Sequence, residues 1–250
     1  METRVVAADR GWQWIVEGFR MFRGQPLVWI AMVVIMLVLS IVSAVIPLLG
    51  ALVLNLVTPV FFAGLMIACR TADQGGEPLV GQLFSAFRTH AAPLVTVGGI
   101  YLVGNIIAVG VMFAMAGGAA LPALLGKGAA NPEALRTAMG GLMLGFAVGL
   151  AVFAPILMAV WFAPLLIVFR NIAPIEAMKL SLLACWQNMM PFLVYGVIAL
   201  VLSIAAFLPL MLGFIVLVPV LVCSIYISYK DVFPEEEAGE PPQQDNPLLS

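Results

Sequence analysis

The sequence is poor in charged side chains: 10% of its 250 residues are Asp, Glu, Lys or Arg, whereas 63% are hydrophobic. Soluble proteins average about 25% charged residues, so 11 basic and 13 acidic side chains are too few to cover a soluble protein of this length. Intrinsic disorder is also excluded, because it requires low hydrophobicity and high net charge, and the net charge here is −2. The composition indicates a membrane protein with lipid as a partner and no nucleic-acid partner.

Residues that commonly carry catalysis or bind metals are scarce as well. The chain has three cysteines, Cys69, Cys185 and Cys223, and a single histidine, His90. Their spacing matches no metal-binding or disulfide pattern, and no nucleophile or acid–base motif such as GxSxG or HExxH occurs. We therefore expect no cofactor, no metal and no catalytic residue, and hence a protein that is not an enzyme.

Long segments without charge predict six membrane-spanning helices. Four segments lack Asp, Glu, Lys and Arg over 46, 38, 33 and 50 residues: 24–69, 89–126, 137–169 and 180–229. A spanning helix needs about 20 apolar residues, so the first and last segments hold two helices each and the middle segments one each. The predicted spans are 26–46, 49–69, 93–115, 140–169, 191–208 and 210–229. The fold class is therefore an all-α polytopic membrane bundle.

The distribution of Lys and Arg predicts the orientation. With both termini in the cytoplasm, nine cations lie inside and two, Lys127 and Arg136, lie outside, as the positive-inside rule requires. Residues 1–230 then form the membrane domain. Residues 231–250 hold six acids and no base, which predicts a disordered acidic cytoplasmic tail and leaves open a protein partner at that face.

Three segments resemble one another: 11–30, 78–97 and 174–194 each place an amphipathic run and an aromatic residue before a proline and an apolar helix. They predict amphipathic helices at the membrane interface, each followed by a helical hairpin, in three parallel units. The expected units are 11–70, 78–170 and 174–230. The expected interfacial anchors are Trp12, Phe19, Phe22, Phe87 and Trp186.

Small residues recur every four positions in the fourth span, at Gly141, Gly145 and Gly149. This spacing lets two helices approach closely. It favours packing inside the monomer, and a dimer seam is the alternative. The sequence leaves the oligomeric state open.

The spans hold polar but no ionisable side chains at their centres, which disfavours ion-coupled transport. Asn55, Thr58 and Asn105 are the candidates for an intramembrane polar site. Asn55 and Thr58 stand beside Pro59, which frees a backbone carbonyl that polar groups can satisfy. The alternative is that these side chains join helices by hydrogen bonds.

Two segments carry a family resemblance: "WQWIVEGFRMFRGQPLVWI" (12–30) and "EAMKLSLLACWQNMMPFLVYG" (176–196). They resemble a family of bacterial six-span inner-membrane proteins of unassigned activity, similar to the membrane region fused to some glycerophosphodiester phosphodiesterases. The resemblance implies a multi-pass protein of the bacterial inner membrane. It carries over no catalytic residue, and the phosphodiesterase domain itself is absent.

These observations support two hypotheses about function. The first is a non-enzymatic membrane protein that acts as a scaffold or interacts with lipid or a partner. The alternative is an uncoupled carrier or channel for a small or lipid-like substrate.

Overall fold

A computed structural model of the chain describes residues 3–46, 48–116 and 132–234, and these residues are α-helical apart from one short 3-10 helix and the connecting turns. Six helical segments in the described part are long and apolar enough to cross a membrane, which confirms the predicted all-α polytopic fold. The elements are α1 (Arg10–Gly24), α2 (Pro26–Ala44), α3 (Leu49–Asp73), η1 (Val80–Phe84), α4 (Ser85–Thr89), α5 (Ala91–Ala116), α7 (Pro132–Trp161), α8 (Ala163–Arg170), α9 (Pro174–Gln187), α10 (Met189–Phe207) and α11 (Phe214–Val232).

The same order of elements occurs three times along the chain. A short amphipathic segment (α1, η1 with α4, or α9) precedes a first long helix (α2, α5 or α10) and then a second one (α3, α7 with α8, or α11). Pro26 and Pro174 stand in the first turn of their helices, where the missing N–H has no partner to lose. Asn171 ends α8 in the left-handed conformation, which asparagine tolerates well.

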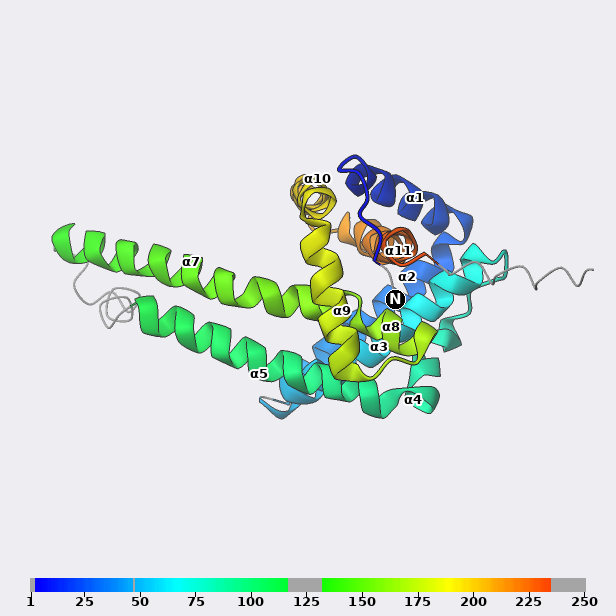
Figure 1. Cartoon of the computed structure of the whole chain (residues 1–250), viewed down its shortest axis with the longest axis horizontal. Helices are drawn as coiled ribbons and strands as arrows, with labels where there is room; N and C mark the ends of the chain where they lie inside the picture. Colours follow the sequence, from blue (N-terminus) through cyan, green and yellow to red (C-terminus); the bar gives the residue numbers. More distant parts are fainter. Residues whose placement is uncertain (1–2, 47, 117–131, 235–250) are drawn as a thin grey trace, which may run out of the picture.

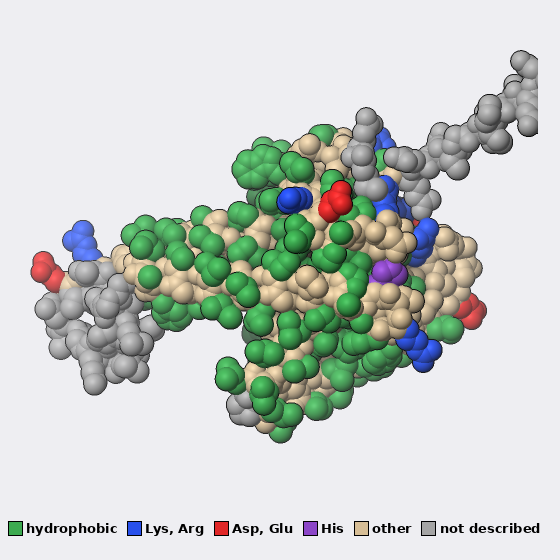
Figure 2. Space-filling model, turned by 60° about the horizontal axis from the view of Figure 1, so that its bottom comes forward, with side chains coloured by type: hydrophobic (Ala, Val, Ile, Leu, Met, Phe, Trp, Pro, Cys, Tyr) green, Lys and Arg blue, Asp and Glu red, His purple; other side chains and the backbone are tan. Residues whose placement is uncertain are grey.

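The three pairs of long helices form arms that leave a common base in different directions. In Figure 1 the α5–α7 arm runs to the left, while α10 is viewed nearly end-on. The arms expose large apolar side chains on their surfaces, including Val53, Ile106, Phe146 and Leu200. Figure 2 shows these hydrophobic surfaces, with most Lys and Arg side chains gathered away from the tip of the α5–α7 arm, toward the base. Such surfaces are stable against lipid.

At the base, each short segment packs on the second long helix of the preceding unit. Segment η1 lies on α3, α9 lies on α7, and α1 closes the ring by packing on α11. Two of these contacts bring backbones together at glycine: a Cβ on Gly64 would be 2.3 Å from the carbonyl oxygen of Leu83, and one on Gly18 would be 2.7 Å from the nitrogen of Ser224. The ring therefore depends on close backbone approach.

The cations that end the second long helices continue this cyclic pattern. The Arg70 guanidinium lies 5.0 Å from the ring centre of Phe169 in the second unit. Arg170 Nε donates a hydrogen bond of 3.3 Å to the hydroxyl of Tyr229 in the third unit. Lys230 Nζ in turn binds Asp73 of the first unit at 2.7 Å. Each unit thus contacts the next one at the base, where its second long helix ends.

The fourth span is interrupted at Phe162, between α7 and α8. The Ser181 hydroxyl of α9 donates to the Met158 carbonyl at 2.6 Å and accepts from the Phe162 N–H at 2.9 Å. These two backbone groups are four residues apart and would bond to each other in an unbroken helix. A side chain inserted between the backbone hydrogen-bonding partners of a helix is a known cause of a kink, and so is a proline such as Pro164.

We expect Ser181→Ala to lower the free energy of unfolding by about 2 kcal/mol, because Met158 O and Phe162 N lose their shared partner at a buried position. Thermal unfolding in detergent measures the change. Ser203→Ala is the matched control, since Ser203 bonds only the carbonyl of Ala199 in its own helix. Equal stability of the two variants would contradict the bridging role.

The N-terminal segment and the end of α11 are fastened to the base by buried polar groups. Asn188 is fully buried and accepts from the Val6 N–H at 2.8 Å, while its amide nitrogen donates to the carbonyls of Arg4 and Ala184. Asp231 accepts a hydrogen bond from the indole of Trp14 at 2.7 Å. Helix α11 ends at Val232, beyond 229, the end of the sixth predicted span, so the first two residues of the tail predicted for 231–250 are helical. Residues 235–250 of that tail lie outside the described residues.

Candidate functional site

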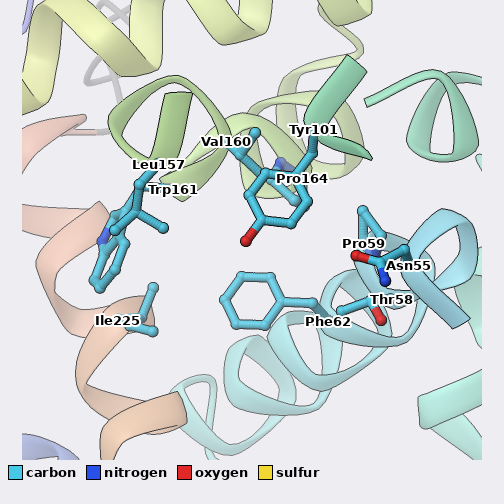
Figure 3. A pocket seen from close by; sticks show the side chains of 10 residues that line it. All are labelled: Asn55, Thr58, Pro59, Phe62, Tyr101, Leu157, Val160, Trp161, Pro164 and Ile225. Atoms are coloured by element: carbon cyan, nitrogen blue, oxygen red, sulfur yellow. The ribbon is translucent and has the colours of Figure 1, made fainter. Parts of the chain in front are cut away.

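A cavity of about 380 Å³ lies where the three arms leave the base. All three second long helices contribute to its wall, together with one residue of α5. The lining residues are Asn55, Thr58, Pro59, Phe62, Tyr101, Leu157, Val160, Trp161, Pro164 and Ile225. Figure 3 shows them around a common space. The cavity is therefore a product of the ring of units rather than of any one hairpin.

The depth of the cavity follows from the register of its walls. Ile225, Pro164 and Pro59 stand five, six and eleven residues before Lys230, Arg170 and Arg70, the cations that end their helices. At about 1.5 Å per residue these positions lie roughly 7–17 Å from the base. A hydrocarbon core of about 30 Å would place them at the level of lipid chains.

The wall is mainly apolar, and its few polar groups are partly satisfied by their own helices. Asn55 Nδ2 donates to the Ala51 carbonyl at 3.0 Å, and Thr58 Oγ1 donates to the Leu54 carbonyl at 2.6 Å. The Asn55 side-chain oxygen and the Tyr101 hydroxyl point toward the interior in Figure 3. They can offer one acceptor and one hydroxyl to a polar group of a guest, in an otherwise apolar space.

Two prolines shape the wall by removing backbone donors. Pro59 lies within α3 and Pro164 begins α8, so neither can donate to the carbonyl four residues earlier. Gly98 lets α5 approach α3 near Pro59, since a Cβ there would be 2.5 Å from the Leu56 carbonyl oxygen. Both prolines thus stand in the cavity wall with no N–H to donate.

The remaining predicted site residues lie elsewhere. Asn105 lines a separate cavity of about 200 Å³ between α5 and α7. Gly149 lies on the same seam, where a Cβ would be 2.9 Å from Met112. Gly145 is buried and Gly141 is half-buried on the same helix.

The five aromatic residues expected as anchors divide into two groups. Trp12 and Phe19 are exposed in an apolar groove of about 430 Å³ between α1, α10 and α11. Phe87 and Trp186 are also exposed, whereas Phe22 is only 6% exposed and packs in the core of the base. An anchoring role therefore remains a prediction for the four exposed side chains.

Most of the cavity wall was not foreseen from the sequence. A usable signal exists in the segments "FAGLMIACR" (62–70) and "FAPLLIVFR" (162–170), which share five of nine residues and align with 222–230 when their terminal cations are matched. In this register Gly64, Pro164 and Ser224 are equivalent. The alignment would have placed the three second long helices around one axis.

The cysteines do not belong to this site. All three are buried and free. Burial raises the pKa of Cys185 in α9 to about 12, so its thiol stays protonated and unreactive near neutral pH. Among the described residues, no group of three or more His, Cys, Asp or Glu side chains is placed to hold a metal ion.

The fold and the apolar cavity define a polytopic helical membrane protein. The chain is 31% identical over 265 aligned positions to a probable inner membrane protein of Burkholderia thailandensis, an alignment that covers 96% of this chain and 97% of the relative. The chain therefore belongs to the family of that probable inner membrane protein. No family model matches the sequence, and no solved structure matches it.

Proposed function

We propose that this protein is a non-enzymatic, lipid-interacting protein of the inner membrane that takes the apolar part of a lipid into the central cavity. The observation that carries the proposal is the cavity itself: about 380 Å³, lined mostly by apolar side chains and opening where the arms separate. Ligand pockets commonly combine an apolar wall with a few polar groups that orient the guest. Asn55 and Tyr101 would do so here.

Packing at the base favours binding over passage through the protein. Aromatic rings pack against one another in the base: Phe162 lies 5.4 Å from Phe233, and Phe169 lies 5.7 Å from Tyr229, between ring centres. A carrier or channel would need an opening through this layer. The layer therefore supports a lipid-binding role above the uncoupled carrier.

Filling the cavity tests the proposal. We expect Thr58→Trp to remove most of the lipid that stays bound to the purified protein, because the indole would occupy the space of the lipid chain. Native mass spectrometry of the protein released from detergent micelles measures retained lipid.

Thr96→Trp is the matched control for this experiment. Thr96 is also exposed and also donates to the carbonyl four residues earlier, but it lies outside the cavity wall. If both variants keep as much lipid as the wild type, the proposal is refuted. If both lose their lipid, the loss is a general effect of the added indole and the cavity is not the cause.

We propose further that the base faces the cytoplasm. Nine of the eleven cations stand in the base or its connections, at Arg4, Arg10, Arg20, Arg23, Arg70, Arg88, Arg170, Lys179 and Lys230. Cytoplasmic loops carry such an excess of Lys and Arg. A protein partner at this face and the acidic tail 231–250 as its docking site remain predictions.

Reporter fusions test the orientation. A fluorescent protein fused after residue 250 should fluoresce, and alkaline phosphatase fused there should be inactive, because phosphatase folds only outside the reducing cytoplasm. The reverse result would invert the orientation. Fusions within 117–131, between α5 and α7, are the control: alkaline phosphatase should be active there.

We propose that the resemblance of segments 12–30 and 176–196 to the membrane region fused to some glycerophosphodiester phosphodiesterases extends to a shared role. We infer that such regions share a lipid-binding role rather than an enzymatic one. Native mass spectrometry of such a region, purified in the same way, tests this inference, and the absence of retained lipid would contradict it.

A further inference from the structure

A second hollow lies at the base, on the opposite side of α1 from the apolar groove. Its volume is about 310 Å³, and its wall comes from the end of α1, the start of α2 and the turn that follows α3. Arg20, Gln25 and Trp29 supply its hydrogen-bonding side chains, and Gly24, Gly75 and Gly76 leave it open. A Cβ on Gly24 would meet nothing within 4 Å. This hollow is thus a preformed space with polar groups in its wall.

The charge in this hollow is not neutralised by the protein. Arg20 is exposed and makes no ion pair or hydrogen bond with any residue that the structure describes. Two of the three nearby acids are engaged elsewhere: Glu17 pairs with Arg10 at 3.0 Å, and Asp73 pairs with Lys230 at 2.7 Å. The third, Glu77, is exposed between the wall residues Gly76 and Pro78 and makes no ion pair with Arg20. Arg20 is therefore available to an anion.

Trp29 supplies an independent sign of a missing ligand. Its side chain is 1% exposed, and its indole N–H has no acceptor in the described part of the chain. Buried donors are nearly always hydrogen-bonded, and an unsatisfied one calls for an explanation. Trp29 belongs to the wall of the hollow, so an acceptor seated there is the simplest partner for it.

The position of the hollow indicates the kind of anion. Gln25 immediately precedes Pro26, the first residue of the spanning helix α2, so the hollow is at the level where a bilayer presents its headgroups. A phosphate group has the negative charge that Arg20 can bind and the acceptor oxygens that the Trp29 and Gln25 N–H groups need.

We propose that this hollow binds a phosphate group, and that a phospholipid headgroup supplies it. The site extends the proposed lipid interaction to the headgroup but does not require the central cavity. The same chemistry would accept inorganic phosphate from solution, and the two sources are separable by experiment.

The full chain in a nonionic detergent is titrated with dioleoyl phosphatidylglycerol and, separately, with dioleoylglycerol, which has the same chains but no phosphate. Bound lipid is counted by native mass spectrometry. We expect the phospholipid to bind more tightly. We expect Arg20→Gln and Trp29→Phe each to weaken its binding about tenfold, the scale of a lost hydrogen bond to a charged group.

Arg88→Gln is the matched control, because Arg88 is exposed on α4 and lies outside the wall of the hollow. Equal weakening by Arg20→Gln and Arg88→Gln would overturn the proposal, since general attraction to anionic lipid would explain both. Unchanged binding in Arg20→Gln and Trp29→Phe would overturn it as well. The detergent-solubilised Trp29→Phe protein should lose some thermal stability, because the smaller ring leaves space at a buried position, and its elution as a single species in size-exclusion chromatography shows that it is folded.

Two further measurements complete the test. Millimolar inorganic phosphate should leave the bound phospholipid in place. If phosphate instead displaces the lipid from the wild type but has no effect on Arg20→Gln, the hollow does bind phosphate, and its ligand comes from solution. Thr58→Trp should leave phospholipid binding at the base intact. Failure of the central-cavity proposal and failure of this one are thereby distinguishable.

Discussion

Gly64→Val should prevent the base from assembling, with a loss of at least about 3 kcal/mol in the free energy of unfolding. A Cβ at position 64 would stand 2.3 Å from the Leu83 oxygen and 2.8 Å from the Gln82 oxygen, and both are backbone atoms. A flexible side chain could move away from the added methyl groups, but backbone atoms of η1 cannot move alone, so η1 would have to separate from α3. Thermal unfolding in detergent, followed by size-exclusion chromatography, measures the loss.

Gly196→Ala is the control for this variant. Gly196 is also inside a long helix, α10, yet a Cβ there would meet nothing within 4 Å. Alanine favours a helix over glycine by up to about 1 kcal/mol, so this variant should be as stable as the wild type or slightly more so. A Gly64→Val protein with wild-type stability would show that η1 and α3 are not closely packed.

Asn188→Ala should cost roughly 2–4 kcal/mol, because it removes a fully buried side chain that makes three hydrogen bonds at about 1 kcal/mol or more each. The Val6 N–H and the Arg4 carbonyl would both lose their partner. The N-terminal segment should then detach. Limited proteolysis near residues 3–9, together with the melting temperature, detects this.

Gln187→Ala provides the comparison for Asn188→Ala. Gln187 is the neighbouring residue at the end of α9, but it is exposed and accepts only one hydrogen bond, from the Thr3 hydroxyl. We expect a change below about 0.5 kcal/mol, as for other exposed positions. Similar losses in the two variants would mean that Asn188 does not fasten the N-terminal segment.

The six long helices could be predicted because lipid imposes a simple rule on the sequence. A charge inside the hydrocarbon core is costly, so Arg23, Arg70, Arg170, Lys179 and Lys230 had to lie outside the spans or at their ends. The gaps between them therefore gave the number of spans. The order of three similar units followed from the recurring prolines and aromatic residues.

The arrangement of these helices could not be predicted in the same way. A lipid-facing surface and a protein-facing surface of a membrane helix are both apolar, so periodicity does not separate them. Phe22 illustrates the point: its side chain is buried in the core of the base, whereas the side chain of Phe19, three residues earlier, is 43% exposed. The pattern places both on one stripe but does not say which surface each contacts.

The candidate site was predicted only in part for a related reason. Asn55 and Thr58 were conspicuous because they are polar within an apolar span. Leu157 and Ile225 are ordinary in composition and join the site only because α7 and α11 lie beside α3 in the ring of units. Side chains of that kind become identifiable only once the helices are placed.

The packing of α1 on α11 sets the order in which the protein can be completed. Helix α1 ends at Gly24 and its partner begins at Phe214, so at about 5–20 residues per second the ribosome needs roughly 10–40 s to supply the second from the first. For most of that interval Trp14 lacks its partners Phe192 and Tyr195 of α10. Gly18 lacks α11 until the end of it, so α1 has to rest at the membrane interface. A chain released before α11 is made would keep this face uncovered, which gives a membrane protease a simple mark of an unfinished product.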